Sequence, residues 1–261
     1  MSFSKHGFFM CKIVVAIVSH GHYDYIINNT ELAKIAKIKN VKIVIKDNIK
    51  DSKLKVYAEL NQFEYVVTPE ILGFGENNNV VHDYAKRELL VSERDWFIIL
   101  NPDVEISAVE FSNLISELIS NTGDFFAPNL FKDKYFTQYE NSIRKFTSYF
   151  DLLNPISLKP INKPYNKDIL TDKAEVEWAS GAFLCVTFES FGFINGFDPK
   201  YFMYYEDVDL CYRLSKVGIK LRFLKNIKAV HKGEYKNRSV FSKHFRWYLS
   251  SLFKFLKTQS Q

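Results

Sequence analysis

Cysteine is scarce in this sequence, and its spacing forms no recognisable motif. The 261 residues contain three cysteines, Cys11, Cys185 and Cys211, none of them in a CxxC pair. An odd number of widely spaced cysteines argues against a disulfide framework and against a zinc site, and it fits a protein of the reducing cytosol.

Long apolar stretches are missing as well. The apolar run from Phe8 to Val18 is interrupted by Lys12 and carries no small-residue cleavage site. It is also too short to cross a bilayer. The rest of the chain has no uncharged apolar window of about 18 residues, the length that a membrane-spanning helix needs. We therefore expect neither a signal peptide nor a membrane span.

Charge of one sign does not dominate either. The formal net charge is +5, and the Lys and Arg residues are spread along the chain. We therefore expect no nucleic-acid partner, although a nucleotide, a diphosphate or an anionic membrane surface fits the small positive excess. A hydrophobic content of 47% with 25% charged residues is typical of a folded domain with a substantial core.

Apolar runs alternate with helical patterns in the first half of the chain. Strands are predicted at 12–18, 41–45, 65–67 and 96–100, and helices at 25–38, 52–60, 80–90 and 108–120. This alternation indicates βαβ units, and hence an α/β fold with a mostly parallel, twisted central sheet flanked by helices.

The pattern weakens between residues 124 and 175, where Pro155, Pro160 and Pro164 suggest an excursion or a loop over the site. Regular structure is predicted again beyond residue 175. The expected elements are strands at 182–186, 221–224 and 229–231, a helix at 207–217, and a basic amphipathic helix at 242–257.

Polar residues follow three of the predicted strands. They are Ser19, His20 and Gly21 after the first strand, Asp47 and Asn48 after the second, and Asn101 to Asp103 after the fourth. Ligands of open α/β sheets gather at the carboxyl ends of the strands. Ordinary turn chemistry is the better explanation of each ending alone, but the three together favour a binding crevice.

Residues 73–78 resemble the G-x-G-x-x-G fingerprint of dinucleotide-binding proteins, but Asn78 replaces the third glycine. A nicotinamide site is therefore not expected. The segment from Gly73 is interpreted as a loop into Asn77, Asn78 and Asn79 that brings backbone N–H groups and amides against a phosphate or a sugar.

Two acidic features could support chemistry. Asp103 is a lone carboxylate at a strand end, and His231 follows a late apolar strand, so the two could share Mg²⁺ with substrate phosphates. The alternative for His231 is a hydrogen-bonded structural histidine.

The second feature is the acidic cluster after the aromatic residues at 202–205. Glu206 and Asp207 lie at the predicted start of a helix. They either take part in catalysis or are placed there because the helix dipole stabilises acidic side chains at this end. Asp209 and Arg213, spaced i,i+4, are expected to pair.

Together these segments resemble an inverting glycosyltransferase of family 2 with a GT-A fold. The resemblance covers nearly the whole chain and is carried by residues 18–21, 47–48, 73–79, 100–103, 178–182, 195–198, 202–210 and 230–231. Asn-Pro-Asp at 101–103, in place of Asp-x-Asp, and the segment 237–247 are similar to bacterial rhamnosyltransferases of O-antigen assembly. That branch implies a dTDP-L-rhamnose donor and a lipid-linked acceptor, GlcNAc-diphospho-undecaprenol.

The resemblance also implies roles for individual residues. Asp207 would be the general base with Glu206 orienting it, and Asp103 with His231 would bind Mg²⁺ or Mn²⁺. Nucleotide-sugar contacts are expected from Ser19, His20, Gly21, Asp47, Asn48, Gly75, Asn77, Asn78, Asn101 and Asp103. Acceptor contacts are expected from Trp178, Ser180, Gly181, Tyr204 and Tyr205.

The expected organisation is a catalytic domain over 1–238, with a nucleotide-sugar half to about 105 and an acceptor half beyond it. The C-terminal helix within 239–261 is expected to touch the inner face of the bacterial cytoplasmic membrane, so the protein would be cytoplasmic and peripheral. The alternative is a helix packed on the domain. Competing functions are transfer from another nucleotide sugar, such as a galactofuranose or UDP-hexose donor, and a non-catalytic sugar-binding protein.

Overall fold

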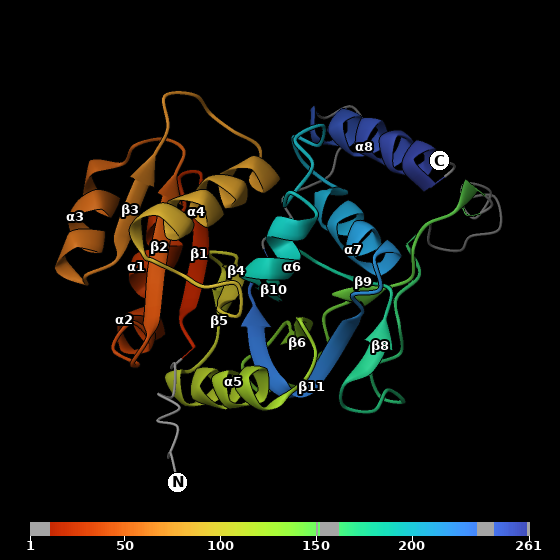
Figure 1. The fold of residues 1–261 in the computed structure, drawn as a ribbon, viewed down its shortest axis with the longest axis horizontal. Coiled ribbons are helices and arrows are strands. Elements are labelled where there is room, and N and C mark those ends of the chain that lie inside the picture. The colour runs from red at the N-terminus through yellow and green to blue at the C-terminus, as the bar shows by residue number, and fades with distance from the viewer. Residues whose placement is uncertain (1–10, 150, 152–161, 234–242, 260–261) are drawn as a thin grey trace, which may run out of the picture.

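A computed structural model describes residues 11–149, 151, 162–233 and 243–259 (Figure 1). Its helices are α1 Tyr23–Asn28, α2 Thr30–Ile35, α3 Ser52–Leu60, α4 Phe74–Glu88, α5 Ala108–Ser120, α6 Phe188–Phe193, α7 Glu206–Lys216 and α8 Lys243–Gln259. Its strands are β1 Ile13–Ser19, β2 Val41–Asp47, β3 Glu64–Val67, β4 Trp96–Leu100, β5 Val104–Glu105, β6 Phe125–Phe131, β7 Ile143–Arg144, β8 Ala174–Val176, β9 Trp178–Ala179, β10 Phe183–Thr187 and β11 Leu221–His231.

One curled sheet organises the molecule. Its strand order is β3-β2-β1-β4-β10-β6-β11-β5, with β8 paired to β11. The first four strands are parallel, as predicted. Strands β1 and β4 are continuous apolar runs because helices cover both faces of the sheet. Beyond β4 the sheet is mixed, since β10 runs antiparallel to both β4 and β6, whereas β6 and β11 are parallel.

Two hydrophobic layers flank the sheet. Helices α4, α6, α7 and α8 pack on one face, and α1, α2, α3 and α5 pack on the other (Figure 1). Alternate residues of β1 divide between the layers: Val14 and Ala16 belong to the first, and Ile13, Val15 and Ile17 to the second. The α/β prediction with flanking helices and a C-terminal helix is therefore confirmed.

Several expected element boundaries were wrong. The predicted helix 25–38 is two short helices, α1 and α2, broken at Asn29, whose amide donates to the Val104 carbonyl 3.1 Å away. The expected strands 221–224 and 229–231 form one strand, β11, with an irregularity between Leu224 and Lys228. The supposed excursion 124–175 contains the buried central strand β6, and the sequence signal for β6 is interrupted by Pro128 and Asn129.

The expected loop at Gly73–Asn79 was also wrong, because α4 begins at Phe74. The Asn77 amide donates to the carbonyls of Leu72 and Gly73, at 3.0 and 2.8 Å, and the Asn78 amide donates to the Phe74 carbonyl at 3.0 Å. These asparagines therefore reinforce the first turns of a helix instead of ending a loop.

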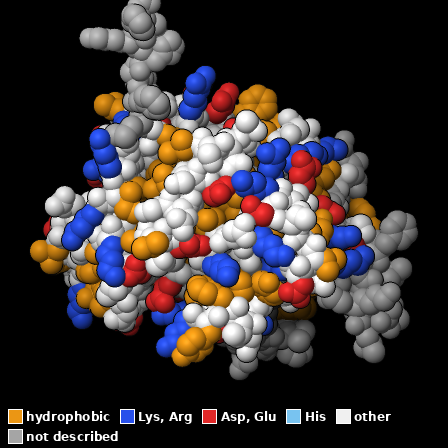
Figure 2. All heavy atoms as spheres, turned by 90° about the horizontal axis from the view of Figure 1, so that it is seen from below, with side chains coloured by type: hydrophobic (Ala, Val, Ile, Leu, Met, Phe, Trp, Pro, Cys, Tyr) orange, Lys and Arg blue, Asp and Glu red, His pale blue; other side chains and the backbone are white. Residues whose placement is uncertain are grey.

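The surface on the side of α5 mixes both signs of charge with single apolar side chains (Figure 2). No helix in the described part of the chain combines the length and apolarity that a bilayer crossing requires.

Candidate active site

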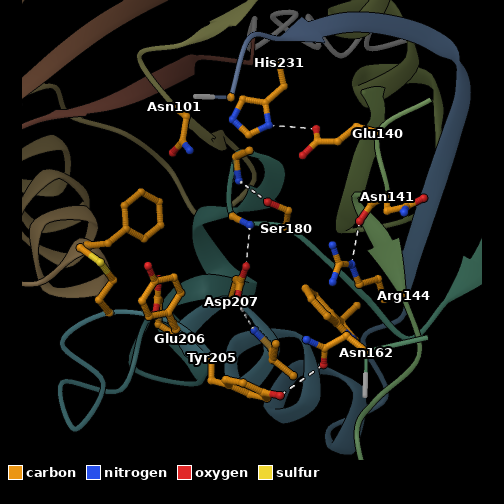
Figure 3. A pocket seen from close by; sticks show the side chains of 18 of the residues that line it. Asn101, Glu140, Asn141, Arg144, Asn162, Ser180, Tyr205, Glu206, Asp207 and His231 are labelled. Carbon is orange, nitrogen blue, oxygen red and sulfur yellow. Dashed lines mark hydrogen bonds and ion pairs between the residues drawn. The ribbon is translucent and has the colours of Figure 1, made fainter. Parts of the chain in front are cut away.

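A pocket of about 390 Å³ opens beside the carboxyl end of β4 (Figure 3). Four segments that are distant in sequence line it: residues 101–103, the paired strands β7 and β9 with the turn that follows β9, residues 203–208, and the end of β11. Glu140, Asn141 and Asn162 also line the pocket, as do two side chains from helices, Phe74 and Tyr248. The pocket therefore forms where the parallel half of the sheet meets the mixed half.

The pairing of β5 with β11 brings Asp103 and His231 together. Val104 lies opposite His231 in that register, and Asp103 Oδ1 is 3.3 Å from His231 Nε2. The other ring nitrogen, Nδ1, lies 2.9 Å from Glu140 Oε2. Burial alone disfavours the charged imidazole, but hydrogen bonds to the two carboxylates raise the pKa of His231 to about 10. Burial is the largest single influence on Asp103 and raises its pKa, but the hydrogen bond and the charge of His231, together with smaller contributions, lower that pKa overall.

This arrangement fits a divalent cation. Glu140 fixes the ring so that Nε2 faces Asp103, which is the usual way a carboxylate orients a metal-binding histidine. Within the described residues, no group of three or more His, Cys, Asp or Glu side chains is placed to hold a metal ion. Two protein ligands suffice for Mg²⁺ or a similar cation when substrate phosphates and water supply the others. Sequence reasoning identified Asp103 and His231 and missed Glu140.

Glu206 and Asp207 form the first turn of α7, on the opposite wall of the pocket. Asp207 accepts hydrogen bonds from the backbone N–H groups of Gly181, at 2.9 Å, and Val208, at 2.8 Å. Burial raises the pKa of Asp207 despite these bonds. Burial and then the charge of Asp207 raise the pKa of Glu206 well above its ordinary value. Glu206 Oε2 is buried and has no hydrogen-bond partner among the described residues, so its surroundings disfavour the charged form.

Asp209 has a separate task. Its side chain is fully buried, and it accepts from Arg213 Nε at 2.6 Å and from the Tyr201 hydroxyl at 3.2 Å. The Arg213 guanidinium also donates to the carbonyls of Ile194 and Gly196. The predicted pairing of Asp209 with Arg213 is confirmed, and Arg213 ties α7 to the turn that follows α6.

The predicted acceptor residues line the pocket. Trp178 donates through its indole N–H to the Lys145 carbonyl at 2.8 Å, and the Ser180 N–H donates to the Ser142 carbonyl at 2.8 Å. A Cβ on Gly181 would lie 3.1 Å from the Phe74 ring, so the position next to Asp207 is closely packed. Sequence reasoning missed Arg144, Asn162 and Tyr248 in the same wall.

Tyr204 and Tyr205, which precede the acidic pair, both have left-handed backbones, with φ of 69° and 64°. Helix α8 packs along this turn. Its Ser251 hydroxyl donates to the Met203 carbonyl at 3.0 Å, and its Tyr248 ring contacts the rings of both tyrosines. A left-handed conformation is unfavourable for a tyrosine, so these contacts hold a strained turn in place.

Apolar residues of α8 belong to the domain core. Leu252, Phe255 and Leu256 are buried with α7, whereas Phe253 is 56% exposed. The alternative of a helix packed on the domain is therefore confirmed for that apolar face. Residues 234–242, which include the predicted boundary at 238 and most of the motif 237–247, lie outside the described residues.

The other predicted nucleotide-contacting residues lie at neighbouring strand ends but away from the pocket lining. Ser19 is paired with Asp47 in register, and Gly21 has φ of 79° in the turn that carries the exposed His20. The Asp47 carboxylate accepts from the Ile49 and Asp51 N–H groups and from a tyrosine hydroxyl. It therefore shapes its own turn.

Asn48 exchanges hydrogen bonds with the backbone of Leu72, and Gly75 packs against Phe197. Asn101 does line the pocket. The nucleotide roles of these residues stay predictions.

No protein-family model matches the sequence. The rhamnosyltransferase WbbL of Escherichia coli K12 is 35% identical over 94% of this chain and 92% of its own length. The chain belongs to the rhamnosyltransferases. It is therefore a glycosyltransferase, and it transfers a rhamnosyl group in glycan assembly.

Two further similarities agree. The N-acetylglucosaminyl-diphospho-decaprenol L-rhamnosyltransferase of Mycobacterium tuberculosis H37Rv is 31% identical over 52% of this chain and 47% of that protein. A crystal structure of GalNAc-T7 with UDP, GalNAc and Mn²⁺ superposes with a TM-score of 0.66 at 15% identity, covering 96% of this chain and 48% of that one. The superposition confirms the GT-A glycosyltransferase fold.

Proposed function

We propose that this rhamnosyltransferase moves L-rhamnose from dTDP-L-rhamnose to a hydroxyl of a lipid-linked GlcNAc-diphosphate, such as GlcNAc-diphospho-undecaprenol, with inversion at the anomeric carbon. The observation that carries the proposal is the placement of Asp207 in the same pocket as the Asp103–His231 pair. A base and a diphosphate-binding end then lie in one cavity. The name of the mycobacterial relative supports the acceptor class.

The proposed reaction is a single displacement. Asp207 accepts the proton of the acceptor hydroxyl while the hydroxyl oxygen attacks the anomeric carbon of rhamnose, and the bond to the dTDP oxygen breaks on the opposite face. The raised pKa of Asp207 strengthens it as a base. Two backbone N–H groups fix its orientation, and burial disfavours a second negative charge on Glu206 beside it.

Asp103 and His231 would hold Mg²⁺ or Mn²⁺, which would neutralise negative charge on the departing diphosphate. Trp178, Ser180 and Tyr205 surround the space beside Asp207 and would orient the acceptor sugar.

The test is Asp207→Asn, assayed with dTDP-rhamnose and a synthetic GlcNAc-diphospholipid. A general base typically contributes a factor of about 10² to 10⁴, so kcat should fall by that much while dTDP binding is retained. Near-wild-type transfer by this variant would refute the assignment, and a product with retained anomeric configuration would refute single displacement. Competition of dTDP-rhamnose with UDP-hexoses for binding separates the proposed donor from the alternatives.

A contact with the cytoplasmic face of the membrane is proposed for the outer face of α8. Arg246, Ser250, Phe253 and Lys257 are exposed, and their spacing of four, three and four residues places them on one stripe of the helix. A basic stripe with an exposed aromatic ring suits an anionic bilayer surface, at about 1 kcal/mol per basic side chain.

The variant that tests the contact is Arg246→Glu with Lys257→Glu, which leaves the buried face of α8 intact. Its sedimentation with anionic liposomes should fall strongly, whereas the charge-conserving pair Arg246→Lys and Lys257→Arg should sediment like the wild type. Equal sedimentation of all three proteins, or no sedimentation of the wild type, contradicts the contact.

A further inference from the structure

Arg144 is a permanent cation in a pocket wall that carries four carboxyl groups. The other ionisable side chains that line the pocket are Asp103, Glu140, Glu206, Asp207, the imidazole of His231 and the phenols of Tyr204, Tyr205 and Tyr248. Among the described residues, Arg144 is thus the lining side chain with a permanent positive charge. The mechanism above gives it no task.

The position of Arg144 is fixed from several sides. Its backbone pairs with Trp178 in β9 and bridges to Pro164 on the other side. Its guanidinium lies over the Trp178 ring, 5.6 Å from the ring centre. Its Nε donates to the Asn141 carbonyl at 2.7 Å. Such an arginine is held ready for a ligand, since little side-chain freedom remains to be lost on binding.

The terminal guanidinium nitrogens, Nη1 and Nη2, are left for a ligand. In the part of the chain that the structure describes, they make no recorded hydrogen bond or ion pair, although four carboxyl groups line the same cavity. Figure 3 shows the guanidinium pointing into the pocket between Glu140 and Asn162. The edge formed by these two nitrogens matches phosphate oxygens, which a guanidinium binds through two parallel hydrogen bonds.

In the proposed reaction, the donor diphosphate and the acceptor diphosphate both approach this cavity. The neighbours of Arg144 indicate which of the two it binds. The charge of Arg144 acts on Asp207, whose pKa it lowers against the effect of burial. Asp207 is where the acceptor hydroxyl is placed in the proposed reaction. The donor diphosphate is assigned to Asp103 and His231, and Figure 3 shows Asn101 and Arg144 on opposite sides of Ser180. Arg144 therefore lies on the acceptor side.

We propose that Arg144 binds the diphosphate of the lipid-linked acceptor and so selects sugar diphosphates over uncharged glycosides. The inference rests on the proposed function, because it takes the acceptor hydroxyl to lie at Asp207. The proposed ligand of Arg144 is an anionic phosphate attached to the acceptor sugar. The diphosphate of the donor is the other group in the reaction that could bind Arg144 in the same way.

The experiment compares two acceptors with the full-length protein. One is GlcNAc-diphosphate on a short lipid chain, and the other is an uncharged alkyl GlcNAc glycoside with the same chain. Arg144→Gln should raise KM for the diphosphate acceptor at least tenfold, because a hydrogen bond to a charged group is lost. KM for the uncharged glycoside should not change, and any effect on kcat through Asp207 should be the same for both acceptors.

Two matched variants control the result. Lys145→Gln removes the same charge one residue along the chain, from a side chain that lies over Tyr165 and does not line the pocket, and should leave both KM values unchanged. Arg144→Lys keeps the charge but lacks the planar guanidinium, so its KM for the diphosphate acceptor should lie between those of the wild type and Arg144→Gln. It also serves if Arg144→Gln does not fold.

The outcomes separate the possibilities. An equal rise in KM for both acceptors would overturn the proposal, and so would weaker dTDP binding by Arg144→Gln, which would assign the arginine to the donor. If the wild type transfers rhamnose to neither acceptor, the proposed function fails. Direct binding of the two lipids to wild type and Arg144→Gln, measured by calorimetry, then decides the role of Arg144: equal affinity of the two proteins for the diphosphate lipid overturns it.

Discussion

Asp209→Asn should separate stability from catalysis within the acidic cluster of α7. Asp209 is fully buried, and its Oδ2 pairs with Arg213 Nε at 2.6 Å. The substitution therefore leaves the guanidinium of Arg213 without this carboxylate as its counter-charge. Breaking a buried pair in this way typically costs about 3–5 kcal/mol. Arg213 is 23% exposed and keeps its bonds to the carbonyls of Ile194 and Gly196, so we expect a loss near the lower end, about 3 kcal/mol.

The measurement is urea unfolding followed by circular dichroism, together with turnover at a temperature at which the variant remains folded. Asp209→Asn should lose unfolding free energy and keep most of its kcat, whereas Asp207→Asn should lose kcat and keep its stability. Asp198→Asn is the control, because its partly exposed pair with Lys200, at 2.8 Å, should contribute at most about 1 kcal/mol. If Asp209→Asn unfolds like the wild type but loses turnover about a hundredfold or more, Asp209 belongs to the chemistry and the division of roles is wrong.

Two further substitutions test packing and pH. Gly75→Ala places a Cβ 2.8 Å from that of Phe197, so overpacking should lower unfolding free energy by about 1–3 kcal/mol, whereas Gly192→Ala, with 3.8 Å of space, should be nearly neutral in urea unfolding. His82 stacks on Phe188 at 5.0 Å, and burial lowers its pKa, so its neutral form is favoured in the folded state. Stability should therefore be full above the ordinary histidine pKa of about 6.5 and fall below it, and His82→Phe should flatten that slope in melting curves at pH 5 to 7; an unchanged slope would contradict this.

The parallel half of the fold was predictable because its signals are local. Strands β1 and β4 are uninterrupted apolar runs, which the coverage of both sheet faces requires. Strand β6 is equally buried but was missed, because Pro128 and Asn129 interrupt its apolar run. Asn129 donates from there to the Lys225 carbonyl, a tertiary contact with no sequence signature.

The site was predictable where polar residues directly follow strands. Asp103 and His231 met this rule, and the pairing of β5 with β11 brings them together. Glu140 and Arg144 did not, because they come from a segment with little regular structure that the β7–β9 pairing positions. No local pattern marks a residue that is placed by a partner strand many residues away.

The amphipathic pattern of α8 identified a helix with an apolar face but not the surface that covers it. A bilayer and a protein core select the same spacing of apolar residues. Leu252 and Phe255 turned out to face the domain, and the exposed Phe253 belongs to the opposite stripe. The pattern therefore predicts burial, and only the folded chain shows where.

The contact of α8 with the turn at Tyr204 and Tyr205 has a consequence for the order of events during synthesis. Because each left-handed tyrosine costs about 1–3 kcal/mol, a ribosome-bound chain that lacks α8 has little to hold this turn before Glu206 and Asp207. The segment that is made after the whole central sheet thus completes the wall of the catalytic pocket. A nascent chain can hold a finished sheet and still be inactive until residues 243–259 have left the ribosome and docked.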